Sequence, residues 1–138
     1  KNKLKWAKNY LIPFRSNLKI ENNILYLSDE KNNILLINLQ NGEKIFDLYT
    51  QPSKTVSKFN STLAFDNNNN LLFLSTTGSL YSLDMLNNQT INWIQNFNLD
   101  NEIIFNAKPL SVIDNIIIVS TDDNINAFTG FTPHYKMP

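Results

Sequence analysis

Residues 71–83 read LLFLSTTGSLYSL, and this stretch decides the fold class. Two apolar runs, 71–74 and 80–83, flank a short polar link that contains Gly78. Runs of about four to eight residues, rich in aliphatic and aromatic side chains and bounded by turn formers, are typical of β-strands. A helix needs roughly ten or more residues with a 3.6-residue period. The stretch therefore predicts two antiparallel strands joined by a tight turn.

The same pattern occurs three times along the chain. Ser28, Ser75 and Ser120 each close an apolar run, as LYLS, LFLS and IIVS, and they are 47 and 45 residues apart. A further apolar strand follows each serine after a polar turn. Another strand, with period-2 alternation, precedes the apolar run that the serine closes. An aromatic residue, Phe46 or Trp93, falls 18 residues after the serine in the first two repeats. Four strands in each repeat of roughly 45 residues are typical of one β-propeller blade.

We therefore expect an all-β fold, with the whole chain forming one partial β-propeller domain. It is an arc of about three four-stranded antiparallel blades, approximately at residues 7–46, 54–93 and 103–130. Residues 1–6 are expected to end a preceding blade, and residues 131–138 to form an irregular tail. A propeller typically has about four to eight blades, so three blades cannot close a ring. We therefore expect a fragment of a longer propeller, one of seven or eight blades. The alternative is that identical chains complete the ring.

Composition argues against several classes of function. The formal net charge is 0, from 12 basic and 12 acidic residues, whereas a nucleic-acid or anionic-membrane surface needs a basic excess. The absence of cysteine excludes disulfides and thiolate metal sites. No apolar run approaches the roughly 18 residues of a membrane-spanning helix. We predict no nucleic-acid partner and no direct membrane span.

Candidate catalytic and metal-binding residues are few. Asp29-Glu30 and Asp122-Asp123 lie in predicted turns, where aspartate is favoured for backbone reasons. His134 is the only histidine and lies in the predicted tail. Calcium needs about six to eight oxygen ligands, and zinc needs several ligands close together. We predict that the chain is not an enzyme and has no catalytic, metal or cofactor site.

The repeats resemble the PQQ-like, or quinoprotein-type, β-propeller repeat. That repeat has a strand reading roughly A-L-D, a turn containing glycine, and a strand ending in tryptophan. Residues 36–38 (LIN), Gly42 and Phe46 match it in the first repeat, and residues 82–84 (SLD) and Trp93 match it in the second. The resemblance implies the propeller fold and leaves the function open.

Within such propellers, residues 11–16 (LIPFRS) resemble a loop of the BamB-type lipoproteins of the outer-membrane β-barrel assembly machinery. The resemblance implies a protein-binding scaffold whose partner is the central barrel protein of that machinery. It implies Ile12, Phe14 and Arg15 as the contact residues. It also implies a periplasmic location and a lipid anchor on an N-terminal part outside this sequence. Residues 58–62 (KFNST) lack the two aspartates that the family places in the corresponding stretch.

Other interpretations remain open at this point. Pro13 and Phe14 can simply pack the loop, with Arg15 capping the end of a strand. A second function is that of an arc of a PQQ- and calcium-dependent alcohol or sugar dehydrogenase, because those enzymes share the repeat. A third is a propeller that recognises some other protein or peptide through its loops.

Overall fold

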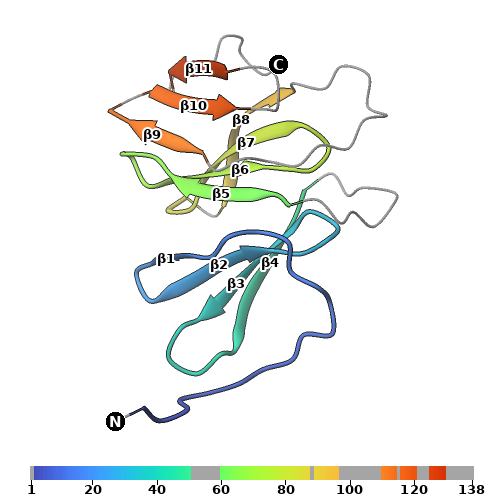
Figure 1. Ribbon diagram of the computed structural model, residues 1–138. Coiled ribbons are helices and arrows are strands. Elements are labelled where there is room, and N and C mark those ends of the chain that lie inside the picture. Colours follow the sequence, from blue (N-terminus) through green and yellow to red (C-terminus); the bar gives the residue numbers. More distant parts are fainter. Residues whose placement is uncertain are drawn as a thin grey trace.

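The computed structural model describes residues 2–50, 60–87, 89–96, 110–114, 116–120 and 125–129. Within these ranges every regular element is a β-strand, and the strands form three antiparallel sheets stacked in chain order (Figure 1). The sheet orders are β1-β2-β3-β4, β5-β6-β7-β8 and β9-β10-β11. The strands are β1 (Lys19–Glu21), β2 (Ile24–Ser28), β3 (Asn33–Asn38), β4 (Lys44–Tyr49), β5 (Thr62–Phe65), β6 (Asn70–Leu74), β7 (Ser79–Asp84), β8 (Thr90–Asn96), β9 (Ser111–Ile113), β10 (Ile116–Ser120) and β11 (Ile125–Thr129).

These sheets confirm the expected all-β fold and the arc of stacked antiparallel blades. The first two sheets follow one plan in detail. Pairing shifts between Leu36 and Ile37 in β3–β4, and between Ser82 and Leu83 in β7–β8. A bulge at the same place in both sheets is a repeated feature, since bulges are specific local adjustments of a strand. The third sheet has three strands within the described residues, one fewer than the predicted blade.

The serine repeat, however, is out of register by one residue. Ser28 pairs with Ile34 at the closed end of the β2–β3 hairpin, whereas Leu74 pairs with Leu80 at the same place in the β6–β7 hairpin. The structural equivalent of Ser28 is therefore Leu74. Ser75 already lies in the turn, because β6 ends one residue earlier than the serine alignment predicts.

Asparagine and glycine occupy the turns at positions that need a left-handed backbone. Asn32, Asn69 and Gly78 have φ angles of 66°, 64° and 87°, each one residue before the next strand begins. Asn22 and Asn23, with φ of 52° and 65°, form the two-residue link between β1 and β2. These residue types adopt positive φ at the least steric cost, and they favour hairpin turns. The many asparagines of the chain thus include several that join strands.

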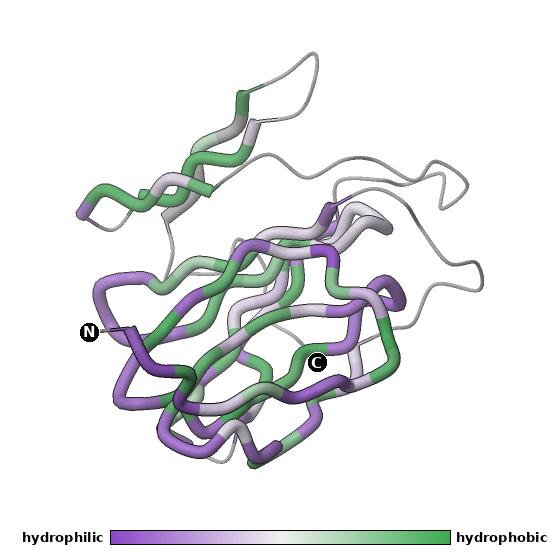
Figure 2. The backbone as a smooth tube through the Cα atoms, turned by 60° about the horizontal axis from the view of Figure 1, so that its bottom comes forward, coloured by the Kyte–Doolittle hydropathy of each residue, from purple (hydrophilic) through white to green (hydrophobic). Residues whose placement is uncertain are grey.

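Apolar clusters fill the two spaces between the sheets. In Figure 2 the hydrophobic segments run through the strands, and the hydrophilic ones lie mainly in the links. β6 contributes side chains to both clusters. Leu71 and Phe73 belong to the cluster shared with the first sheet, and Leu72 and Leu74 belong to the cluster shared with the third. All four side chains are fully buried. The first sheet contributes Tyr26, Ile34 and Leu36, and the third contributes Ile117 and Val119.

The aromatic residues that close the first two repeats differ in burial. Trp93 is 6% exposed and belongs to the cluster between the second and third sheets. Phe46 is its counterpart, since Leu36 pairs with Phe46 and Ser82 with Trp93 just before the bulge, but Phe46 is 41% exposed. Trp93 therefore packs between two sheets, whereas a large part of Phe46 is exposed.

A buried polar contact also joins the first two sheets. The Asn32 side chain is fully buried and donates from Nδ2 to Thr76 Oγ1 at 2.9 Å. Its Oδ1 accepts the backbone N–H of Thr76 at 3.0 Å. The turn of one hairpin is therefore fastened to the turn of the next, because a buried amide must find partners on both its oxygen and its nitrogen.

The Asn32–Thr76 contact gives a stability prediction. We expect Asn32→Ala to lower the free energy of unfolding by about 2–4 kcal/mol, because the Thr76 N–H is left buried without its acceptor. Asn69→Ala is the matched control, since Asn69 has nearly the same φ but an exposed side chain. Asn69→Ala should lower the free energy of unfolding by only about 1–2 kcal/mol, which is the cost of placing alanine at a positive φ. Urea unfolding of both variants measures the difference, and equal losses would contradict a stabilising contact.

Candidate protein-binding site

Segment 11–16, which carries the predicted contact residues, is held by backbone hydrogen bonds on two sides. Arg15 N donates to Ser28 O at 2.9 Å, and Glu30 N donates to Pro13 O at 3.0 Å, so the segment lies along the β2–β3 hairpin. On its other side Ser61 N donates to Arg15 O at 3.0 Å. Segment 11–16 thus connects the first sheet to the beginning of the second.

The side chains of Ser16 and Asn17 strengthen this connection. The Asn17 side chain donates to Leu63 O at 2.9 Å and accepts from Leu63 N at 2.8 Å, as a neighbouring strand would. Ser16 Oγ accepts from Ser28 N at 2.7 Å. Part of the stretch aligned with the family's two aspartates, residues 58 and 59, lies outside the described residues, while Ser61 and Thr62 are buried. The described part of that stretch therefore contacts segment 11–16 through backbone groups.

The three predicted contact residues occupy different environments. Ile12 is 43% exposed. Phe14 is half-buried against the apolar cluster of Leu27, Leu35 and Ile37, so it takes part in packing the loop. Arg15 is half-buried, and within the described part of the chain its shielded Nε has no hydrogen-bond partner.

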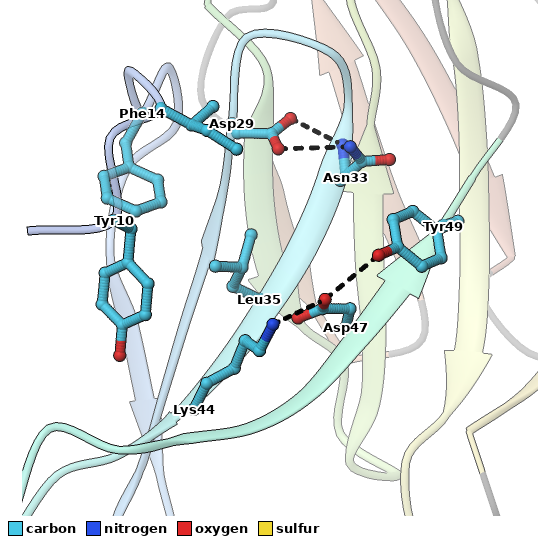
Figure 3. A pocket seen from close by; sticks show the side chains of 9 residues that line it. Tyr10, Phe14, Asp29, Asn33, Leu35, Lys44, Asp47 and Tyr49 are labelled. Carbon is cyan, nitrogen blue, oxygen red and sulfur yellow. Dashed lines mark hydrogen bonds and ion pairs between the residues drawn. The ribbon is translucent and has the colours of Figure 1, made fainter.

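A groove lies beside segment 11–16, on the face of the first sheet that points away from the second. It has a volume of about 130 Å³. Figure 3 shows Tyr10 and Phe14 along one side, Leu35 in the middle and Asp47 with Tyr49 along the other. Its lining residues are Tyr10, Ile12, Phe14, Asp29, Asn33, Leu35, Lys44, Asp47 and Tyr49. Two of the predicted contact residues line this groove, and Arg15 does not.

The charged groups of the groove have unequal sets of partners. Asp47 Oδ2 accepts from Lys44 Nζ at 2.9 Å and from Tyr49 Oη at 3.1 Å. The Asp47 carboxylate thereby raises the pKa of the Lys44 ammonium above its ordinary value, mainly through this hydrogen bond. The Asp29 carboxylate is fully engaged, because it accepts from the backbone of Lys31 and from both nitrogens of Asn33. The two carboxylates and one ammonium leave the lining with a formal charge of −1.

The N-terminal strap, residues 2–10, lies across the same face of the first sheet. Trp6 Nε1 donates to Leu39 O at 2.7 Å, and Tyr10 Oη donates to Gly42 O at 2.5 Å. Lys8 pairs with Glu43 at 2.9 Å, which raises the pKa of the lysine. The strap is thus attached to the link between β3 and β4. Trp6 and Tyr10 cover the apolar cluster that Phe14 also contacts.

The predicted absence of catalytic chemistry is tested only in part. Asp29 has a structural role, because its Oδ1 accepts backbone hydrogen bonds in the turn between β2 and β3. No group of three or more His, Cys, Asp or Glu side chains is found where the structure describes the chain. Asp122, Asp123 and His134 lie outside the described residues. The absence of a catalytic, metal or cofactor site stays a prediction for the chain as a whole.

Sequence reasoning missed the polar side of the groove. Asp47, Lys44 and Tyr49 belong to an exposed outer strand, and their letters alone suggest only a solvated edge. A signal was present in the repeat itself. Asp47 pairs with Leu35 as Ile94 pairs with Tyr81 in the second sheet, so a carboxylate replaces an apolar side chain at an equivalent position.

Comparison with known proteins supports the fold. No protein-family model and no curated protein sequence matches the chain. BamB from Moraxella catarrhalis superposes with a TM-score of 0.65 at 11% identity, over 96% of this chain and 39% of that protein. KlHsv2 with loop 6CD replaced by a Gly-Ser linker gives a TM-score of 0.55 at 18% identity, over 92% and 38%. This chain therefore spans less than two-fifths of either protein.

At these identities the likeness shows the fold alone, that of an arc of a β-propeller related in structure to BamB. The assignment to PQQ-like repeats stays a prediction. The described part of the chain contains no helix long and apolar enough to cross a membrane.

Gly42 provides a test of the strap. A Cβ added there would lie 2.6 Å from Trp6 Cε3, and the backbone has φ of 76°. We expect Gly42→Ala to displace the strap, shift the Trp6 indole N–H resonance and lower the free energy of unfolding by about 1–3 kcal/mol. Gly78→Ala, with φ of 87° in the turn between β6 and β7, is the control and should leave that resonance in place. An unmoved Trp6 resonance in Gly42→Ala would contradict the packing of the strap on this turn.

Proposed function

We propose that this chain is an arc of a non-catalytic propeller that acts as a protein-binding scaffold in the assembly of outer-membrane β-barrel proteins. Its partner is the central barrel protein of the assembly machinery, and the contact residues are Ile12, Phe14 and Arg15. The proposal places the protein in the periplasm, held at the outer membrane by a lipid anchor on a part outside this sequence. The blades are assigned to residues 7–46 and 54–93, followed by 103–130, within a propeller of seven or eight blades.

The attachment of segment 11–16 to two sheets is the observation that carries the proposal. Its backbone is hydrogen-bonded to the β2–β3 hairpin through Arg15 N and Pro13 O, and to Ser61 at the beginning of the second sheet through Arg15 O. A loop already held in one conformation loses less conformational entropy on binding than a free loop does. Segment 11–16 thus has the rigidity that a recognition loop needs.

The side chains of the segment fit the same role. Ile12 offers an exposed apolar contact, and Phe14 supports it from a half-buried position beside the groove. Arg15 has a shielded Nε without a partner among the described residues, and a carboxylate or carbonyl on a partner protein would supply the acceptor. Arginine beside apolar residues is a frequent anchor of protein interfaces. The likeness of fold to BamB supports the choice of partner.

The experiment is a pull-down of the purified central barrel protein with the intact chain and with Arg15→Glu. We expect charge reversal at the anchor to weaken binding by about tenfold or more, as truncation of an interface hot spot does. Lys31→Glu is the matched control, because Lys31 is an exposed cation in the neighbouring turn and the charge change is the same. Circular dichroism establishes that each variant is folded.

Two results would refute the proposal. The first is that the intact chain does not bind the barrel protein. The second is that Arg15→Glu and Lys31→Glu weaken binding equally, which would mean that only the overall charge matters. The milder variant Arg15→Gln keeps the test valid if the reversed charge prevents folding, and we expect it to weaken binding in the same direction.

A further inference from the structure

At one equivalent position the outer strand of the first sheet is charged where that of the second is apolar. In the second sheet Ile94 stands opposite Tyr81 and packs against the cluster between the first two sheets. In the first sheet the equivalent residue is Asp47, opposite Leu35. The face of the first sheet that points away from the second is therefore apolar only in part. The strap covers the apolar part, and the groove lies over the polar part.

Asp47 has one oxygen without a hydrogen-bond partner in the described part of the chain. Oδ2 accepts both hydrogen bonds, from Lys44 and from Tyr49. Oδ1 is shielded from solvent, and among residues with described placement none donates to it. A shielded carboxylate oxygen that lacks a donor is unfavourable, so a ligand that brings an N–H group to it gains a charge-assisted hydrogen bond. Among the described residues, the groove thus lacks a hydrogen-bond donor to Asp47 Oδ1.

We propose that this groove is a socket for an arginine side chain of a protein partner, with the guanidinium donating to the Asp47 carboxylate. The proposal rests on the proposed protein-binding function and names the chemistry that the partner brings to the same surface. Ile12, one of the contact residues assigned above, lines the groove, so the socket is continuous with segment 11–16.

The size and charge of the groove fit this occupant. A volume of about 130 Å³ is close to that of an apolar cavity that holds benzene, so the groove accommodates one side-chain head group. The formal charge of −1 on the lining favours a cation. The rings of Tyr10, Phe14 and Tyr49 border the groove, and aromatic rings attract the flat guanidinium more than they attract a hydrated ammonium (Figure 3).

The socket can be tested with a small probe. The full ¹⁵N-labelled chain is titrated by NMR with the peptide acetyl-Leu-Arg-Leu-amide, and in parallel with the citrulline peptide, which has nearly the same shape without the charge. We expect the arginine peptide to shift the amide resonances of Leu35, Asp47 and Tyr49. We expect the citrulline peptide to bind about tenfold more weakly or not at all.

A matched pair of variants locates the binding. Asp47→Asn removes the charge while preserving the size of the side chain, and we expect it to weaken the arginine peptide by about tenfold or more. Glu21→Gln changes the net charge equally but lies on β1, outside the groove lining and away from the attachments of the strap, and it should leave binding unchanged. Because the citrulline comparison uses the unaltered chain, the test holds even if Asp47→Asn fails to fold.

Four outcomes would overturn the socket. The first is that the arginine and citrulline peptides bind equally, and the second is that Asp47→Asn leaves binding unchanged. The third is self-association of the chain that Asp47→Asn abolishes. The fourth is loss of peptide binding in a form of the chain extended at its N-terminus. The third would assign the groove to a second copy, and the fourth to a neighbouring blade. Each leaves the Arg15→Glu pull-down unaffected, so failure of the socket and failure of the proposed function are distinguishable.

Discussion

The middle sheet of this chain has two apolar faces, and both must be kept from water. β6 illustrates the constraint, since its four consecutive side chains Leu71, Leu72, Phe73 and Leu74 are all fully buried and alternate between two clusters. A sheet of this kind cannot be stable alone, and stacking like sheets side by side satisfies all but the first and the last. The three-sheet arc is the direct result.

The outward face of the first sheet shows how that constraint is met where no described sheet covers it. The strap supplies Trp6 and Tyr10, and segment 11–16 supplies Phe14, to cover Leu27 and Leu35. Farther out, Asp47 makes the surface polar. A face that would otherwise only need burial is thereby divided into a covered apolar part and a groove with a carboxylate, and this division gives the surface its chemical character.

Polar contacts complement the apolar stacking. Apolar contact is non-directional, whereas a buried amide accepts only partners in set positions. Asn32 meets Thr76, and Asn17 meets the backbone of Leu63, so the second sheet is tied to the first at two separate points. The same ties restrict segment 11–16, because Asn17 directly follows it. Packing of the sheets and rigidity of the proposed contact surface thus have a common source.

The sequence by itself determined the strands, their antiparallel order and the repeat, because period-2 burial and left-handed turns depend on neighbouring residues. Local sequence predicts the turns at Asn22-Asn23, Asn32 and Gly78 whatever the position of the rest of the chain. Only the tertiary structure decided the one-residue correction of the serine register and the place of Asp47 in a groove. The serine register depends on the pairing between strands. The place of Asp47 depends on the pairing of β4 with β3, and the groove also needs the strap, more than thirty residues from Asp47 along the chain, to lie across the sheet. Contacts of that kind are set by the packing of distant segments, which no local pattern specifies.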